Sequence, residues 1–483
     1  MHEGKKTPEE QFAMRGLKEQ LRSFFEPDGV AIIGASRTEG RPGYCAVENL
    51  VRLGYSGRIY PVNPEADEIL GLRAFPDIES IPDKVEFAVV LAPAPEVIQL
   101  VTRCASKGVK AVTLVSGGFS EYSRQGAILE SRLVEAVRKV GMRLIGPNAV
   151  GPINSSNNLA VFLGRISPLK KGAIALVAQT GQVCSYVIEW MDSFLRQGVS
   201  KVIDLGNKAD IDDSEVVAYL ADDPETRVIA IHIEGMKNGR RFLEAARRAS
   251  QKKPIVCYKT GWSEGGSKAA ASHTGSIIGS KQVIDAALKQ SGIISVRDMD
   301  SFLEFAKAFA YFHPPKGNRV GIVTLSGGSG VMASDTCAEV GLQLAEFSQE
   351  TRRRLEKIQP PDLGVSNPFD VGKASVVLYG PDRAYKEATQ ALIDDENTDC
   401  VLIVLGAAGS KVVYGTNPEV FTEVNNEHNK PIVAVLMGTN LESVWEQSNI
   451  LEANGIPVYP WPERAIRALG ALREYGIYLS RSR

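Results

Sequence analysis

One histidine of this chain lies among small residues. His273 stands in the stretch Ala270-Ala271-Ser272-His273-Thr274-Gly275-Ser276, near the end of a glycine- and alanine-rich segment that runs from Thr260 to Gly279. Few side chains there can pack, so the segment predicts a mobile loop that presents the imidazole to more than one place. Such an imidazole can act as a nucleophile or a proton carrier. A single loop histidine is more often a surface residue without a role, so the rest of the chain must decide between the two interpretations.

Two further features fit a nucleophilic histidine. Thr180-Gly181 follows an apolar run and opens a predicted helix, whose backbone N–H groups would suit a phosphorylated imidazole because that group is anionic. Glu234 follows the apolar run that starts at Val228 and would orient one ring nitrogen, fixing the tautomer in which the other is nucleophilic. The alternative for Glu234 is a carboxylate at a helix amino terminus.

The elements that must position these residues alternate between short β-branched runs and longer amphipathic stretches. This pattern is typical of parallel sheets covered by helices, and it separates into three blocks. The second and third blocks repeat one order of elements, in which 174–181 is echoed by 320–328, 228–231 by 401–404, and 253–256 by 430–433. The third block has no histidine where the second has His273. We therefore place the reactive centre in the second block and expect scaffolding or an interface from the third.

The strands of the first block end in turns of small residues, namely Gly34-Ala35-Ser36-Arg37 with Gly43 at the next helix, Ala92-Pro93, and Ser116-Gly117-Gly118. Carboxyl ends of parallel strands meet at one edge, so these turns would point bare backbone at a crevice. The glycines do not follow Gly-x-Gly-x-x-Gly, and Asn63-Pro64 stands where a dinucleotide site has an acidic residue, which disfavours a nicotinamide dinucleotide. The pattern leaves open a nucleotide-like ligand and a purely structural sheet.

Composition excludes several classes of protein. A chain of 483 residues is too long to fold around one hydrophobic core, and its length indicates about two to four domains. A formal net charge of −2 argues against nucleic acid as the main partner. The six cysteines have no C-x-x-C pair and no histidine at metal-ligand spacing, which indicates reduced core residues of a cytosolic protein. The stretch up to Gln20 lacks an apolar signal core and no run of about 18 apolar residues occurs, so neither secretion nor a membrane span is expected.

Motifs along the whole chain carry a resemblance to a known family. In chain order they are Ile32-Ile33-Gly34-Ala35-Ser36-Arg37, Gly54-Tyr55 with Tyr60-Pro61-Val62-Asn63-Pro64, Ile145-Gly146-Pro147-Asn148, Gly206-Asn207-Lys208-Ala209-Asp210, Ile233-Glu234-Gly235 and Ala271-Ser272-His273-Thr274-Gly275. With these the chain resembles the α subunit of ADP-forming acyl-CoA synthetases of the acetate–CoA ligase type, in the superfamily of succinyl-CoA synthetase. The histidine motif is the specific one, and it favours a catalytic His273.

The resemblance implies an α/β fold in which a Rossmann-like CoA-binding domain precedes two flavodoxin-like, succinyl-CoA synthetase-like domains. Pro-containing stretches at Ser167-Pro168 and His313-Pro314-Pro315 fit the junctions. The expected parts are a helical lead-in at 1–25, the CoA-binding domain at 26–153, the flavodoxin-like domain with the phosphohistidine loop at 166–312, and the second flavodoxin-like domain at 317–483.

The resemblance also implies a reaction, the interconversion of acyl-CoA, phosphate and ADP with a carboxylic acid, CoA and ATP through an acyl phosphate and a phosphohistidine. His273 would carry the phosphoryl group, with Glu234 as its partner. Phosphate would lie against Gln179, Thr180, Gly181, Thr274 and Gly275. CoA would be held by Gly34, Ala35, Ser36, Arg37, Gly43, Asn63, Pro64, Ala92, Pro93, Ser116, Gly117, Gly118 and Asn148. No residue of this chain is expected to ligate a metal.

Departures from the family pattern shape the expected partners. No stretch remains for the family's ATP-grasp unit, so Mg²⁺ and ADP or ATP are expected on a separate ATP-grasp β subunit of a hetero-oligomer. Ala178, Ala149 and Trp262 stand where the family commonly has Ser, Cys and Arg, which leaves a larger or aromatic acid open beside acetate. Two other functions would use part of these features. A catalytically inactive CoA- or acyl-CoA-binding regulatory subunit would need neither His273 nor Glu234, and an NAD-linked oxidoreductase would leave the histidine segment unexplained.

Overall fold

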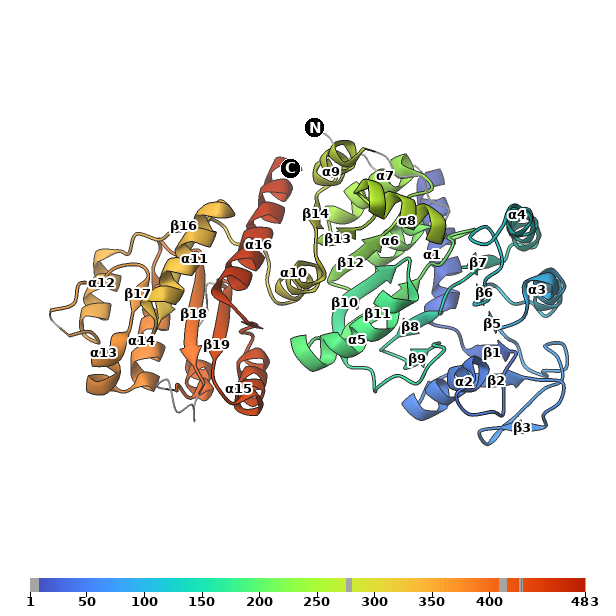
Figure 1. Ribbon diagram of the computed structural model, residues 1–483, viewed down its shortest axis with the longest axis horizontal. Coiled ribbons are helices and arrows are strands. Elements are labelled where there is room, and N and C mark those ends of the chain that lie inside the picture. The colour runs from blue at the N-terminus through green and yellow to red at the C-terminus, as the bar shows by residue number, and fades with distance from the viewer. Residues whose placement is uncertain are drawn as a thin grey trace. The chain divides into compact units, whose positions relative to one another are not determined.

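The structure is a computed structural model that describes residues 8–274, 280–360, 362–407, 415–424, 427 and 429–482 (Figure 1). The chain divides into two compact units, Met1–Phe302 and Leu303–Arg483. Each unit is built on mainly parallel sheets covered by helices, which confirms the predicted α/β class.

The first sheet of the unit Met1–Phe302 is parallel, with the strand order β2-β1-β5-β6-β7. Its central strands are buried along their whole length, and this burial explains why they are continuous apolar runs. The order reverses between β1 and β5, where a doubly wound sheet opens a ligand crevice. The elements are α1 Pro8–Phe25, β1 Gly29–Ile33, α2 Pro42–Leu53, β2 Arg58–Val62, β3 Glu68–Ile69, β4 Leu72–Arg73, β5 Phe87–Val90, η1 Ala94–Glu96, α3 Val97–Ser106, β6 Ala111–Leu114, α4 Arg124–Lys139 and β7 Arg143–Ile145.

The second sheet of this unit has the order β14-β13-β12-β10-β11-β8-β9. Strands β10 to β14 pair in parallel, and β8 adds itself antiparallel to β11. The elements are β8 Pro152–Asn154, β9 Leu159–Ala160, β10 Lys171–Ala178, α5 Gly181–Leu195, β11 Val199–Asp204, α6 Asp213–Ala221, β12 Val228–Ile233, α7 Gly239–Ser250, β13 Ile255–Lys259, α8 Glu264–Thr274, α9 Lys281–Gln290 and β14 Ile293–Val296. Helix α10, Met299–Tyr311, contains the point at which the two units divide.

The unit Leu303–Arg483 repeats the design of the second sheet. Its order is β16-β15-β18-β19-β20, with β17 pairing the far end of β15, so β15, β18 and β19 correspond to β10, β12 and β13 as the sequence repeat predicts. The elements are β15 Arg319–Thr324, α11 Gly327–Glu339, β16 Gln343–Leu344, α12 Gln349–Glu356, β17 Phe369–Asp370, α13 Gly372–Tyr379, α14 Pro381–Asp394, β18 Cys400–Gly406, η2 Pro418–Glu423, β19 Ile432–Met437, α15 Leu441–Ala453, β20 Val458–Tyr459 and α16 Pro462–Ser482.

The first two sheets share one hydrophobic core. A single cluster of buried side chains runs from β1 through α6 to β14. Phe25, the last residue of α1, stacks on Tyr219 of α6 with ring centroids 5.3 Å apart. The first helix therefore lies between both sheets and holds them in one unit.

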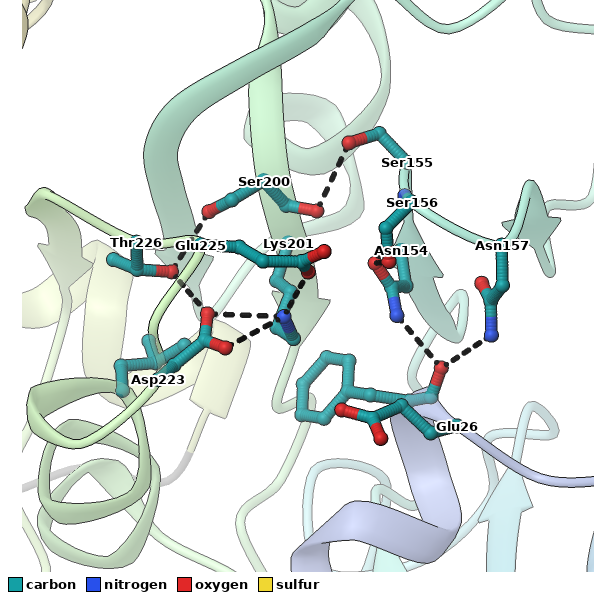
Figure 2. A network of polar contacts seen from close by, with 12 residues as sticks. Glu26, Asn154, Ser155, Ser156, Asn157, Ser200, Lys201, Asp223, Glu225 and Thr226 are labelled. Carbon is teal, nitrogen blue, oxygen red and sulfur yellow. Dashed lines mark hydrogen bonds and ion pairs between the residues drawn. The ribbon is translucent and has the colours of Figure 1, made fainter.

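A buried polar network joins the same elements at the amino end of β11 (Figure 2). Asn154 and Asn157 both donate through Nδ2 to the Phe25 carbonyl at 3.0 Å. Lys201 is 1% exposed, and its Nζ lies 2.9 Å from both carboxylate oxygens of Asp223 and 2.8 Å from Glu225 Oε2. A buried cation is stable only when anionic groups pair with it. The ion pairs of Lys201 on β11 with Asp223 and Glu225 therefore hold the loop after α6 against the sheet.

Replacing Lys201 with methionine should lower the free energy of unfolding by about 3 kcal/mol, because two carboxylates would stay without their cation. Urea denaturation at pH 7.5 measures the loss. The control is Lys252→Ala, which removes an ion pair with Asp222 between half-exposed side chains and should cost at most about 0.5 kcal/mol. Equal losses for the two variants would contradict a structural role for the buried network.

The cysteines occupy the core. Cys45, Cys104, Cys184, Cys257, Cys337 and Cys400 are all buried with free thiols, as predicted. Burial raises the pKa of the Cys104 and Cys257 thiols to about 12, so these thiols stay protonated and unreactive at neutral pH. Within the described part of the chain, no helix is both long enough and apolar enough to cross a membrane.

Candidate active site

The turns predicted to hold CoA lie at the carboxyl edge of the first sheet. Each begins within three residues of the end of a strand of that parallel sheet, so all of them reach the same edge. The edge carries Gly34, Ala35, Ser36 and Arg37 after β1, Asn63 and Pro64 after β2, Ala92 and Pro93 after β5, Ser116, Gly117 and Gly118 after β6, and Asn148 after β7. The structure thus brings these predicted residues to one edge of the sheet, and the turns after β1 and β5 lie where the strand order reverses.

Two glycines let α2 approach the β1 turn closely. Gly34 has φ +91°, and a Cβ on Gly43 would lie 2.1 Å from the Gly34 carbonyl oxygen. Helix α2 starts beside this turn at Pro42, and its N-cap residue Arg41 makes no side-chain capping hydrogen bond. Pro42 has no N–H, and the N–H groups of Tyr44 and Cys45 donate to the Arg41 carbonyl, so the Gly43 N–H is the donor that this helix start offers to an anion. The exposed Arg37 and Arg41 add positive charge. These features fit the phosphate groups of CoA.

Adding a methyl group at Gly43 should disturb this fit. In the variant Gly43→Ala the new Cβ would push the start of α2 away from Gly34, which should destabilise the fold by about 1–3 kcal/mol and weaken CoA binding by about tenfold or more. Isothermal titration with CoA measures the second effect. Val51→Ala, on the same helix and 41% exposed, is the matched control and should leave CoA affinity unchanged. Unchanged affinity in Gly43→Ala would place CoA elsewhere.

Asn63 shapes the neighbouring turn. Its Nδ2 donates to the Ala35 carbonyl at 2.7 Å, and its Oδ1 accepts from Glu65 N at 2.8 Å. Pro64 and Pro93 are exposed at the edge, whereas Ala92 is buried beneath it. In this structure Asn63 thus holds the turn that follows β1 and leaves the exposed prolines to line the crevice.

A carboxylate already occupies the turn after β6. Glu121 Oε1 accepts from the backbone N–H groups of Gly118 at 2.6 Å and Phe119 at 3.2 Å, and Oε2 accepts from Asn207 Nδ2 at 2.5 Å. Burial alone would raise the pKa of Glu121, but these hydrogen bonds outweigh it and lower the pKa. The Gly118 N–H is therefore engaged within the protein, and Asn207 ties this turn to the second sheet.

The predicted phosphate turn lies between β10 and α5. Thr180 is the N-cap of α5 and makes no side-chain capping bond, so the start of this helix also keeps N–H groups for an anion. Gln179 is buried, and its Oε1 accepts from Glu234 N at 3.3 Å and Gly235 N at 3.1 Å. The structure thus brings the phosphate turn and the Glu234 turn together across 55 positions of sequence.

Two buried lysines hold the Glu234 turn from the other side. Lys259 Nζ donates to the Glu234 carbonyl at 2.6 Å. Lys208 Nζ donates to the Gly235 carbonyl at 3.0 Å and pairs with Asp213 at 2.6 Å. With Gln179, every backbone N–H and carbonyl of Glu234 and Gly235 has a partner, so the position of the half-buried Glu234 is fixed by its surroundings.

A cavity of about 200 Å³ opens beside the phosphate turn. It is lined by the predicted residues Asn148, Gln179, Thr180 and Gly181, by the apolar Val115, Ala149, Val150 and Leu163, and by Asp204. Asn148, with φ +58°, comes from the first sheet, and Gln179 comes from the second. The cavity therefore lies between the edge of the first sheet that is predicted to hold CoA and the predicted phosphate turn.

The segment around His273 is not the loop that the sequence predicts. The backbone of residues 264–274 forms helix α8, and His273 and Thr274 are its last two residues. Ser263 starts the helix by accepting from Gly266 N at 3.1 Å through Oγ, and Lys268 pairs with Glu264 one turn away. Alanine is the best helix former, which explains the error. The side chains of His273 and Thr274, and Gly275 as a whole, lie outside the described residues.

Sequence reasoning missed Asp204, Lys208, Lys259, Asn207 and Glu121 as members of this site. A signal was present for four of them, since Asn207 belongs to the same motif as Lys208. Asp204 and Lys259 are charged residues that end apolar strands, and Lys208 belongs to Gly206-Asn207-Lys208-Ala209-Asp210, a motif used only for the resemblance. What these side chains contact could not be read from the chain.

Three family models match the chain. A CoA binding domain matches residues 28–154, a succinyl-CoA ligase like flavodoxin domain 171–309, and a ligase-CoA domain 320–478. Among curated proteins, the acetate–CoA ligase [ADP-forming] II subunit alpha of Pyrococcus furiosus is 38% identical over 94% of this chain and 97% of its own length. The acetate–CoA ligase [ADP-forming] II of Archaeoglobus fulgidus is 39% identical over 94% of this chain and 67% of its own length.

Solved structures agree. The dinucleotide forming acetyl-coenzyme A synthetase 1 of Ca. Korarchaeum cryptofilum, in complex with phosphate and ADP, superposes with a TM-score of 0.87 at 32% identity over 96% of this chain and 99% of that chain. The likeness covers both described units and all three family models. The chain therefore belongs to the family of ADP-forming acyl-CoA synthetases and corresponds to their α subunit.

Proposed function

We propose that this chain is the phosphoryl-carrying subunit of an enzyme that interconverts acyl-CoA, phosphate and ADP with a carboxylic acid, CoA and ATP. One observation carries the proposal. Gln179, in the anion-binding turn at the start of α5, also holds the Glu234 backbone, beside a cavity that reaches the CoA edge of the first sheet. A thioester at that edge, a phosphate at the helix start and a carboxylate near both are what the reaction needs.

The proposed chemistry has three balanced steps. A phosphate oxygen attacks the thioester carbonyl carbon, the carbon–sulfur bond breaks, and CoA leaves as its thiol with a proton that phosphate gives up. A ring nitrogen of His273 then attacks the phosphorus of the acyl phosphate, and the carboxylate leaves. Finally an oxygen of ADP attacks the phosphohistidine and frees the imidazole, giving ATP. Glu234 would hold the ring nitrogen that does not react.

The roles of the binding residues follow from their placement. CoA phosphate groups would lie against the start of α2 with Arg37, and the pantetheine end would run past Ala92-Pro93 and Ser116-Gly117 toward the cavity. The phosphate under attack would lie against Thr180 and Gly181 at the start of α5. The N–H groups at these helix starts attract an anion through partial charges and do not form a full ion pair with it.

A second subunit is part of the proposal. Mg²⁺ and ADP or ATP would bind on an ATP-grasp β subunit, giving a hetero-oligomer. In support, this chain matches 97% of an α-subunit relative but 67% of a single-chain relative, which contains more sequence than the matched part. We place the enzyme in the cytoplasm, where six buried, unpaired thiols are expected. We also propose that the CoA-binding domain spans 26–153 and that the two flavodoxin-like domains span 166–312 and 317–483.

The experiment is phosphorylation of the chain itself. The purified protein, incubated with its co-purifying nucleotide-binding subunit, magnesium and ATP, should gain one phosphoryl group by intact mass. The group should be lost in acid and stable in alkali, as expected of phosphohistidine. ATP replaced by a non-hydrolysable analogue serves as the control.

The opposite result is equally informative. No mass gain in the presence of a partner shown to bind nucleotide would overturn the enzyme and favour a CoA- or acyl-CoA-binding regulatory subunit. A mass gain that survives acid would move the phosphoryl group to a hydroxyl side chain and overturn the role of His273.

A further inference from the structure

The cavity beside the phosphate turn contains one buried charge that the proposed reaction does not use. Asp204 is the last residue of β11 and is 1% exposed. It lines the cavity together with apolar side chains such as Val115, Val150 and Leu163. A carboxyl group in such a wall is costly unless hydrogen-bond donors satisfy it, so its partners decide what the cavity can bind.

The protein satisfies only part of the hydrogen-bonding capacity of the Asp204 carboxyl group. Oδ2 accepts from Val150 N at 3.0 Å and Oδ1 accepts from Gly206 N at 3.1 Å. A carboxylate offers about four acceptor positions, so each oxygen keeps capacity for one more donor. Asp204 and Gly181 both line the cavity, and a Cβ built on Gly181 would lie 3.8 Å from Oδ2 and only 2.8 Å from Val150 Cγ1, so the absence of a side chain at Gly181 keeps this part of the wall clear. The remaining acceptor capacity is therefore available to the acyl chain of an acyl phosphate whose phosphate lies at the start of α5.

The Asp204 carboxyl is charged at the pH at which such an enzyme is assayed. Burial raises its pKa to about 6, and the Glu234 carboxylate adds to the rise. The N–H groups of Gly206 and Val150 and the Lys208 ammonium oppose it. Above pH 7 the group is mostly a carboxylate, which attracts hydrogen-bond donors.

The size of the cavity is compatible with more than an acetyl group. Its volume is about 200 Å³, whereas an apolar protein cavity of about 150 Å³ already admits benzene. A short chain or one ring therefore fits beside Asp204, with apolar contacts from Leu163 and Val115.

We infer that Asp204 is a specificity-determining residue, and that the cavity selects carboxylic acids whose chain carries a hydrogen-bond donor, a hydroxyl or an ammonium group. This inference rests on the proposed function, since it assigns the acyl group of that reaction to this cavity. A donor on the substrate would complete the hydrogen bonds of Asp204. An unsubstituted chain would leave a desolvated carboxylate facing carbon.

The test compares acids that differ only in the donor. The chain with its nucleotide-binding subunit is assayed at pH 8 for ATP- and CoA-dependent thioester formation. The substrates are propionate, 3-hydroxypropionate and β-alanine, and phenylacetate with 4-hydroxyphenylacetate. We expect kcat/KM for the better donor-bearing acid to exceed that of its plain partner by about 10- to 100-fold.

Variants assign the preference to one side chain. In Asp204→Ala the ratio should fall to about 1. In Asp204→Asn, which keeps one acceptor oxygen, the preference for a hydroxyl should persist in part while any preference for ammonium is lost with the charge. Asp223→Asn, at a buried aspartate near the other end of β11, is the matched control and should leave the ratio unchanged. Circular dichroism checks that each variant is folded.

Two outcomes would overturn the inference in different ways. If the wild-type complex converts plain and donor-bearing acids equally, or if Asp204→Ala keeps the wild-type ratio, Asp204 does not select the substrate although the proposed function stands. If the wild-type complex neither forms thioester from any acid nor gains acid-labile phosphate, the proposed function itself fails, and the inference fails with it.

Discussion

The variant His273→Ala should lose ATP formation from acyl-CoA, phosphate and ADP by about 10⁴-fold or more, because the proposed mechanism carries the phosphoryl group from the acyl phosphate to ADP on this imidazole. CoA affinity should change by less than about twofold, since the CoA edge lies on the first sheet and His273 on α8. Steady-state ATP formation and isothermal titration with CoA measure the two quantities on the same preparation.

A partial reaction sharpens this experiment. Phosphate-dependent release of CoA from acyl-CoA precedes the histidine step, so a single turnover of thiol release should survive in His273→Ala. Ser272→Ala, one position earlier on α8, is the matched control and should keep near-wild-type ATP formation. ATP formation retained in His273→Ala would remove the phosphohistidine from the mechanism.

The second large effect belongs to Glu234. The variant Glu234→Gln should slow phosphorylation of the chain by ATP by about 100-fold, because an amide orients and stabilises the reacting imidazole much less well than a carboxylate. The backbone contacts of Glu234 with Gln179 and Lys259 do not involve its side chain, so the turn should stay in place. Rapid-quench measurement of phosphorylated protein gives the rate.

A matched carboxylate separates this role from general electrostatics. Glu264 at the start of α8 pairs with Lys268, and both side chains are largely exposed. Glu264→Gln should therefore change the phosphorylation rate by less than about twofold. If Glu234→Gln phosphorylates as fast as the wild type, Glu234 has a structural role at the turn and another group must orient the histidine.

Much of the fold could be predicted from local patterns. The apolar run before the predicted turn at Gly34 is strand β1, Gly29–Ile33, because a strand covered on both faces has an uninterrupted apolar sequence. The repeat between the second and third blocks reappears as the same neighbours around β10 and β15. Helix α8 was predicted as a loop, since glycine and serine mask the helix propensity of its alanines and the Ser263 cap.

Only the part of the candidate site that lies in the turns after strands could be predicted from the sequence. Turns after β1, β6 and β10 were found because every parallel strand delivers its last residue to the same edge. The contact of Gln179 with Glu234 crosses 55 positions, and the contact of Asn207 with Glu121 crosses 86. No periodicity or spacing encodes contacts of that range. The sequence therefore predicts Gln179 only as a residue that contacts phosphate, and it gives no site role to Asn207.

The amino-acid sequence by itself determined the parallel α/β architecture, the duplicated block, the sheet edge at which we expect ligands and the residues of a type able to react, because strand periodicity and chemical type are local properties. The tertiary structure alone decided which of these residues meet. Packing of the two sheets on one core sets Lys208 and Lys259 against the Glu234 turn and buries Asp204 in the cavity wall. A buried charge acquires its role from the partners that surround it, and those partners come from distant parts of the chain.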